Sequence, residues 1–337
     1  MSNYPYNPYS YNPQQYQQQY VEMQKKASQK RELRRRSTLI GCGIIIYVVL
    51  CVALIVLTVR LSGNSELYDT NALFSNCVQI FVSIIALLGA FFIVRRVIDK
   101  KHVSFIPFGA PANKKHALLL IPFGVAACLA GSIATGYMDQ FLQKAFDVVF
   151  TEPEFAEPTT PFEAVIFLIS TALVPAFVEE ITLRAGVLQA MRKYGDWFAI
   201  ITSSFIFAVL HGNMIQTPFA FIAGIALGYV FIATGSIWPG IAIHFINNFV
   251  SSLVTVAYAF GLDDKIIGSV FDIYAMSICI IGLVCFLVYF FDKKRPVLQK
   301  DTSLLSLPQK TGAFLINVPM IVSLIYVFYA TAGTIER

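Results

Sequence analysis

The sequence predicts an all-α membrane protein, a polytopic bundle of about eight to nine transmembrane helices. Of its 337 residues, 56% are hydrophobic and only 13% are charged, whereas soluble globular chains carry about 25% charged residues. Several uninterrupted apolar stretches reach the roughly 20 residues that a helix needs to cross a bilayer. A transmembrane β-barrel is excluded, because its segments are shorter and alternate in polarity with a period of two.

Nine apolar stretches are predicted to form helices. They cover residues 38–59, 73–94, 117–136, 162–183, 197–211, 217–234, 237–259, 267–291 and 312–333. We assign N-terminal spans to residues 37–140, core spans to 160–255 and C-terminal spans to 256–337. No internal repeat divides them, so one folding unit is the simplest interpretation.

Residues 1–36 are polar and rich in Tyr, Gln and Pro. They cannot bury enough apolar surface to fold, so a disordered tail is expected. The tail becomes basic before the first span, and loops 95–115 and 292–300 are also basic. Since basic loops favour the cytoplasmic side, we expect a multi-pass protein of the cell membrane with a cytoplasmic N-terminus. The net charge of +5 reflects this topology, and no nucleic-acid partner is expected.

Ionisable side chains inside apolar stretches are the most informative feature, because such groups are costly at membrane depth and usually face an interior cavity. Three clusters stand out: VEEITLR with Glu179, Glu180 and Arg184, FAVLH with Phe207 and His211, and HFINN with His244, Asn247 and Asn248. The other two histidines are His102, in the basic loop 95–115, and His116, directly after it; solvated surface positions are expected for both. One intramembrane histidine can simply join two helices, but this combination favours chemistry.

Helical spacing separates the roles within these clusters. Glu180 and Arg184 are four residues apart, so they share a helix face and can form an ion pair. Glu179 is rotated by about 100° and faces other surroundings. A buried carboxylate without a cationic partner suits a general base. His244 and Asn248 also share a face.

The three clusters, in this order, resemble the motifs of the CPBP family, which comprises CAAX prenyl proteases and bacteriocin-processing enzymes and is also called the Abi family. The family pattern is EExxxR, then FxxxH, then HxxxN or HxxxD, on successive membrane helices. All three motifs are present without a departure, and the resemblance covers roughly residues 160–255.

The resemblance implies an intramembrane endopeptidase that cleaves a membrane-associated protein or peptide. Carried over by motif, Glu179 and His211 would activate the attacking water, and His244 and Asn248 would stabilise the oxyanion. Glu180, Arg184 and Phe207 would support the site. No cofactor is certain. Glu179, His211 and His244 could ligate Zn²⁺, but metal-free hydrolysis fits the same residues.

Two other interpretations stay open. The first is a non-catalytic immunity or scaffold protein, because members of the Abi family are associated with self-immunity to bacteriocins. The second is a transporter, which the lack of a repeat disfavours. Counting along the spans also leaves a discrepancy: Glu179 and His244 fall near the cytoplasmic side, whereas His211 falls roughly 21 Å into its span.

Overall fold

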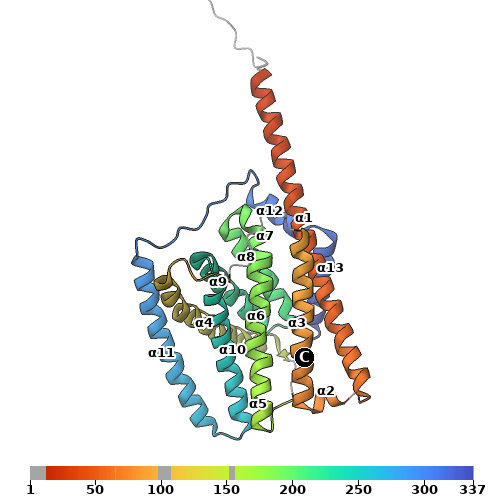
Figure 1. The fold of residues 1–337 in the computed structure, drawn as a ribbon, viewed down its shortest axis with the longest axis vertical. Coiled ribbons are helices and arrows are strands. Elements are labelled where there is room, and N and C mark those ends of the chain that lie inside the picture. Colours follow the sequence, from red (N-terminus) through yellow and green to blue (C-terminus); the bar gives the residue numbers. More distant parts are fainter. Residues whose placement is uncertain (1–12, 65, 98–107, 152–155, 337) are drawn as a thin grey trace, which may run out of the picture.

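The computed structural model describes residues 13–64, 66–97, 108–151 and 156–336, and this part of the chain is almost entirely helical (Figure 1). The helices are α1 (Pro13–Ser62), α2 (Leu67–Thr70), α3 (Ala72–Val97), α4 (Lys114–Phe146), α5 (Pro161–Leu168), α6 (Val174–Glu180), α7 (Gln189–Met191), α8 (Asp196–His211), α9 (Gln216–Thr234), α10 (Trp238–Ala259), α11 (Asp264–Phe291), α12 (Leu307–Leu315) and α13 (Val318–Ala332). Two short strands, β1 (Val149–Phe150) and β2 (Ile335–Glu336), pair antiparallel.

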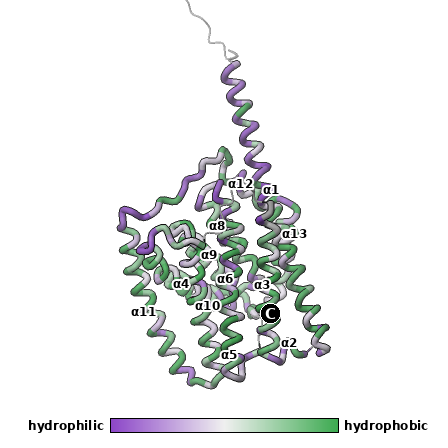
Figure 2. Tube along the Cα trace, viewed as in Figure 1, coloured by the Kyte–Doolittle hydropathy of each residue, from purple (hydrophilic) through white to green (hydrophobic). Residues whose placement is uncertain are grey.

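The predicted fold class is confirmed. Within the described residues, seven helical segments are long and apolar enough to cross a membrane. An eighth would be the pair α12 and α13, which is bent by 74°. Each of the nine predicted stretches is mainly helical, with 312–333 interrupted between α12 and α13. The helix α8 has 16 residues and is too short to be among the seven. Figure 2 shows apolar residues throughout the bundle and hydrophilic residues on the N-terminal half of α1.

The prediction of a disordered tail is wrong for residues 13–36. They form one continuous helix with the first span, and this helix extends well beyond the bundle (Figure 1). The physical reason is that Gln, Lys, Arg and Glu are good helix formers, and the last turns before the span are anchored to other helices. Leu33 and Ser37 are fully buried there. Residues 1–12 lie outside the described part of the chain.

The helical run Pro161–Tyr194 contains Glu179 and Glu180 and is not a uniform α-helix. Thr160 and Glu163 form a capping box at its start. Two π-helical segments, η1 (Ile169–Leu173) and η2 (Ile181–Leu188), flank α6, and a short 3₁₀ turn, η3 (Arg192–Tyr194), ends the run. Short π-helical segments often occur at functional sites. Here they place the glutamates between two irregular segments.

The run Pro161–Tyr194 and α8 form a hairpin that settles the discrepancy in depth. The predicted span ended at residue 183, but the helix continues to Tyr194, and Gly195 reverses the chain with φ of 100°. Glu179 lies as many residues before Tyr194 as His211 lies after Asp196, about 22 Å of helix at 1.5 Å per residue. Glu179 and His211 therefore lie at a similar distance from the turn.

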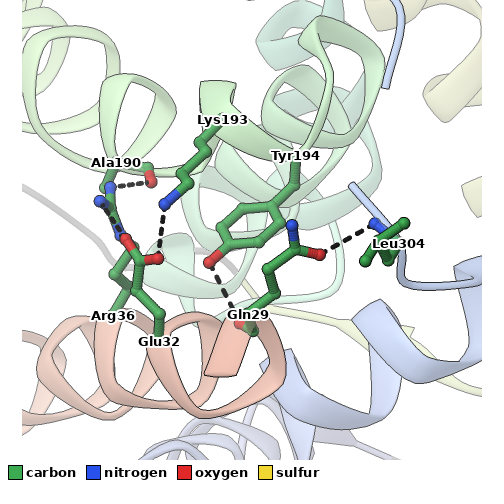
Figure 3. Close-up of polar contacts among 7 residues, drawn as sticks. All are labelled: Gln29, Glu32, Arg36, Ala190, Lys193, Tyr194 and Leu304. Carbon is green, nitrogen blue, oxygen red and sulfur yellow. Dashed lines mark hydrogen bonds and ion pairs between the residues drawn. The ribbon is translucent and has the colours of Figure 1, made fainter. Parts of the chain in front are cut away.

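Segments distant in sequence hold this turn, and we call them the turn clasp (Gln29, Glu32, Arg36, Gln299, Asp301 and Lys310). In Figure 3, the Glu32 carboxylate lies 2.6 Å from Lys193 Nζ, and Arg36 donates to the Ala190 carbonyl at 2.8 Å. Tyr194 donates to the Gln29 carbonyl at 3.3 Å, and the Gln29 side chain accepts from the Leu304 amide at 2.8 Å.

The C-terminal members of the turn clasp contact the turn through two buried side chains, Asp196 of the turn and Lys310 of the clasp. Asp196 is 1% exposed, accepts from the Gln299 amide at 2.7 Å and donates its own N–H to the Gln299 carbonyl at 3.2 Å. Lys310 is 5% exposed and donates to the Tyr194 carbonyl at 3.3 Å and to Asp301 at 2.6 Å. A segment of α1 and the segment 299–310 thus hold the turn of the hairpin from two sides.

The expectation of a solvated histidine is wrong for His116. Its side chain is buried in the first turn of α4, against the Tyr289 ring, with centroids 5.2 Å apart. Its Nε2 lies 3.3 Å from the Asp292 carboxylate. Loop 95–115 is shorter than predicted because α4 begins at Lys114. His102 lies outside the described residues.

Candidate functional site

The site begins with the predicted ion pair on the run Pro161–Tyr194. Arg184 Nε lies 3.2 Å from Glu180 Oε2, and both side chains are fully buried. These atoms are close enough to form an ion pair, but they are not aligned as a hydrogen bond, and the Arg184 nitrogens make no hydrogen bond within the described residues. Burying two charges is costly unless they neutralise each other. The pair is therefore a fixed, electrostatically balanced support.

His244 on α10 lies between the two glutamate carboxylates. Its Nδ1 is 3.1 Å from Glu180 Oε1, and its Nε2 is 3.6 Å from Glu179 Oε2. Gly240 permits this approach, because a Cβ added there would lie 3.0 Å from Glu180 Oε2. The Glu179 side chain is 23% exposed, in contrast to that of Glu180. Glu180 thus holds the imidazole ring, and Glu179 is the carboxylate with access to its surroundings.

Phe207 on α8 connects the three motifs. Its ring lies 5.0 Å from Arg184 Cζ, and its centroid is 4.8 Å from that of His211 and 5.8 Å from that of His244. A cation over an aromatic face is stabilised most when both are desolvated. The Arg184 guanidinium lies over the Phe207 ring, and both imidazole rings make T-shaped contacts with it.

His211 lies at the end of α8, where Gly212, with φ of 65°, ends the helix. Its Nδ1 is 2.8 Å from the Phe207 carbonyl oxygen, which suits a donated N–H and leaves Nε2 as an acceptor. Asn248 lies one turn beyond His244 and donates from Nδ2 to the Thr171 carbonyl at 3.3 Å. Pro175 has no N–H for that carbonyl, which lies four residues earlier in the helix.

Zinc was the cofactor left open by the resemblance, with Glu179, His211 and His244 as its ligands. In the described part of the chain, no group of three or more His, Cys, Asp or Glu side chains is spaced to hold a metal ion. No chemical step below is therefore assigned to a metal. Zinc binding stays a prediction.

Sequence reasoning predicted the Glu180–Arg184 pair but missed the contact of Glu180 with His244. Spacing along one helix detects partners three or four residues apart, whereas this contact joins two helices. It also missed that Phe207 contacts Arg184, since the four-residue spacing relates Phe207 only to His211 on the same helix. The FxxxH spacing gives no information about a third helix.

The fold and the site define a polytopic membrane protein with an acid–imidazole cluster enclosed by its helices. Residues 161–250 match the family model described as type II CAAX prenyl endopeptidase Rce1-like. The matched segment contains all three motifs, and the resemblance to the CPBP family is confirmed over these residues. No curated protein and no solved structure matches the chain. The family match points to a protease, and therefore to a hydrolase with a peptide or protein substrate.

Proposed function

We propose that the protein is an intramembrane endopeptidase that hydrolyses a peptide bond of a membrane-associated protein or peptide, in the manner of CAAX proteases. The observation that carries this proposal is His244 between Glu179 and Glu180, in the segment that matches the family. One carboxylate is buried and paired, and the other is partly accessible. This asymmetry separates a supporting acid from a reacting one.

In the proposed reaction, Glu179 accepts a proton from water as the water oxygen attacks the substrate carbonyl carbon. His211 Nε2 would hold the same water. When the C–N bond breaks, the proton passes from Glu179 to the leaving nitrogen, which balances the reaction. The tetrahedral oxyanion needs hydrogen-bond donors placed in advance.

His244 and Asn248 would supply those donors. Nδ1 of His244 donates to Glu180, and Nε2 lies on the side of Glu179. In this role the ring carries a proton on both nitrogens, because only an imidazolium donates from Nδ1 and Nε2 together. The bond from Asn248 to Thr171 uses one of the two hydrogens on Nδ2, which leaves the other for substrate. Arg184 balances the charge of Glu180, and Phe207 keeps both rings in place.

The location is part of the proposal. We place the protein in the cell membrane with its N-terminus in the cytoplasm, because the loop charges follow the positive-inside pattern. The tail, the turn clasp and the Asp292–Lys300 stretch would then face the cytoplasm.

The test compares membranes carrying wild type with membranes carrying Glu179→Ala, His211→Ala or His244→Ala. Peptide termini are mapped by proteomics in each sample. We expect termini present with wild type and absent with all three variants, while each variant still inserts into the membrane. Asp272→Asn is the matched control, because Asp272 is an acid in an apolar helix, exposed and outside the site.

The alternative of a non-catalytic immunity or scaffold protein predicts the reverse. If the three variants leave the cleavage pattern unchanged, the peptidase proposal is wrong. If they also keep a protective or partner-binding phenotype, the non-catalytic function is favoured.

A further inference from the structure

Peptide hydrolysis consumes one water molecule for each bond cleaved, and this inference rests on the proposed function for that need. The site lies inside the bundle: Glu180 and Arg184 are fully buried and His244 is 5% exposed. The hydrocarbon around membrane helices offers no water. Water must therefore reach Glu179 along polar groups within the protein.

The two sides of the site differ in polarity. Toward the turn at Gly195, the hairpin is filled mostly by buried apolar side chains of one continuous core, which include Leu183, Val187, Leu188, Met191, Ile200 and Ile206. Such side chains cannot hydrogen-bond water. The buried hydroxyls on this side (Thr182, Thr202, Ser203 and Ser204) each bond to a backbone carbonyl, and within the described residues they form no hydrogen bonds with one another. The side toward the turn therefore offers water no connected line of polar side chains.

A line of polar side chains lies on the other side of the site, toward the start of α5, and we call it the polar track (Asn76, Ser170, Thr171, Asn248 and Ser252). His244, Asn248 and Ser252 are spaced four residues apart on α10 and so share one face. Because α10 runs antiparallel to the glutamate helix, Ser252 meets Thr171 while His244 meets Glu180. The track therefore starts at the oxyanion donors.

Hydrogen bonds connect the members of the track. Asn248 donates to the Thr171 carbonyl at 3.3 Å, and the hydroxyls of Thr171 and Ser252 are 2.8 Å apart. The hydroxyls of Thr171 and Ser170 both bond to the Phe167 carbonyl, at 2.7 and 2.9 Å. The π-helical segment η1 contains both residues.

The track continues to the edge of the bundle. Ser170 donates to the side-chain oxygen of Asn76 on α3. Asn76 lies one turn inside the start of α3 at Ala72, and Asn71 before it is exposed. One turn farther along α3, the side-chain oxygen of Gln79 is buried with no hydrogen-bond partner among the described residues. An unpaired buried carbonyl of this kind is a place where water binds.

We infer that the polar track carries water to the site from the face of the bundle at which α3 and α5 begin. Hydroxyl and amide groups can exchange their mutual hydrogen bonds for bonds to water at little net cost. Each member can therefore bind a passing water molecule while the apolar core on the other side stays closed. The ligand of the track is water itself.

Cysteine labelling tests the track without relying on catalysis. The six native cysteines are replaced by alanine, and Ser252→Cys is compared with Leu253→Cys in oriented proteoliposomes. Leu253 is the next residue on α10 and is 46% exposed, on the outside of the bundle. A charged, membrane-impermeant methanethiosulfonate is added on the side where α3 begins. We expect at least about tenfold faster labelling at position 252, because thiolates form only where water is present.

Equal rates at the two positions would overturn the inference, since they are expected if the track only joins helices. Faster labelling at position 252 together with no cleavage by wild type would support the track but reject the proposed peptidase. The two proposals can therefore fail separately.

A second variant tests the track in the intact enzyme. Thr171→Val removes the hydroxyl and keeps the volume, so we expect kcat to fall by about fivefold with KM unchanged. Thr58→Val is the matched control, because within the described residues the Thr58 hydroxyl bonds only to carbonyls one turn back on α1, at 2.9 Å. Unchanged kcat in Thr171→Val would count against the track.

Discussion

Glu179 and Glu180 are neighbours in the sequence but have different surroundings. Glu180 is fully buried between Arg184 and His244, whereas the Glu179 side chain is 23% exposed and approaches one imidazole nitrogen at 3.6 Å. Because the helix rotates by about 100° per residue, two identical carboxylates face different surroundings. Glu180 is enclosed by its partners, and Glu179 is the carboxylate that the proposed reaction uses.

This difference predicts that substitutions of Glu180 mainly reduce stability, whereas substitutions of Glu179 mainly reduce cleavage. Glu180→Leu leaves the buried Arg184 charge uncompensated, so we expect the free energy of unfolding to fall by about 3–5 kcal/mol. The double variant Glu180→Leu with Arg184→Met should recover a large part of that loss. Glu179→Gln should change the free energy of unfolding by less than about 1 kcal/mol and abolish cleavage. Denaturant unfolding in detergent measures the stability of all three variants, and mapping of peptide termini measures cleavage by Glu179→Gln.

A double variant no more stable than Glu180→Leu would show that the ion pair is not what Glu180 contributes.

Among the elements, the hairpin with Gly195 at its turn determines which residues meet. The turn packs so closely on the C-terminal segment that a Cβ at Gly195 would lie 3.2 Å from the Asp301 side chain. The turn clasp therefore couples both chain ends to the two helices that bear Glu179 and His211. Buried Lys310 has its charge balanced by Asp301 at 2.6 Å.

Titration of Asp301 should reveal the contribution of the turn clasp. Burial alone would raise the pKa of Asp301, but hydrogen bonds from Lys310 and Ser303 outweigh it and hold the pKa below its usual value. A carboxyl with a lowered folded-state pKa stabilises the protein above its unfolded pKa of about 3.9, and this stability is lost as the pH falls further. We expect the unfolding temperature to drop below about pH 4.

Asp301→Asn should lower the unfolding temperature at neutral pH and flatten its decline in acid. A residual decline is expected from Asp292, whose pKa is lowered by hydrogen bonds from the Lys294 amide and from Lys115. Asp264→Asn, at the exposed start of α11, is the control and should retain the profile of wild type. An unchanged profile in Asp301→Asn would contradict the prediction.

At the scale of the whole molecule, the segment that matches the family covers residues 161–250 and contains the complete site. The turn clasp lies outside it, as do Asn76 and Ser252 of the polar track. The helices before and after this segment therefore hold its turn and extend its polar residues to the edge of the bundle. We expect the matched segment to need them in order to act.

The proposed orientation makes a testable prediction for the whole chain. In a cysteine-free background, Asn64→Cys should react with an impermeant maleimide in intact cells, because the loop 60–72 carries no basic excess. Lys294→Cys, in the basic stretch after α11, should react only after the cells are opened. The opposite pattern would place the N-terminus outside.

The sequence by itself determined the all-α membrane class, the approximate spans and the three clusters of polar residues. These follow from local chemistry, because apolar length and buried charge are readable along the chain. It also determined the pairing of Glu180 with Arg184, since both lie on one helix. Its segment boundaries other than the tail stay predictions, as do the catalytic roles of Glu179, His211, His244 and Asn248.

Only the tertiary structure decided what depends on other helices. It placed His244 between the two glutamates, brought Phe207 against Arg184 and buried His116 beside Tyr289. It also gave the last turns of the helical tail partners near residues 190–194 and 304. The physical reason is the same throughout: helical periodicity fixes which residues share a face, but packing between helices selects what that face meets.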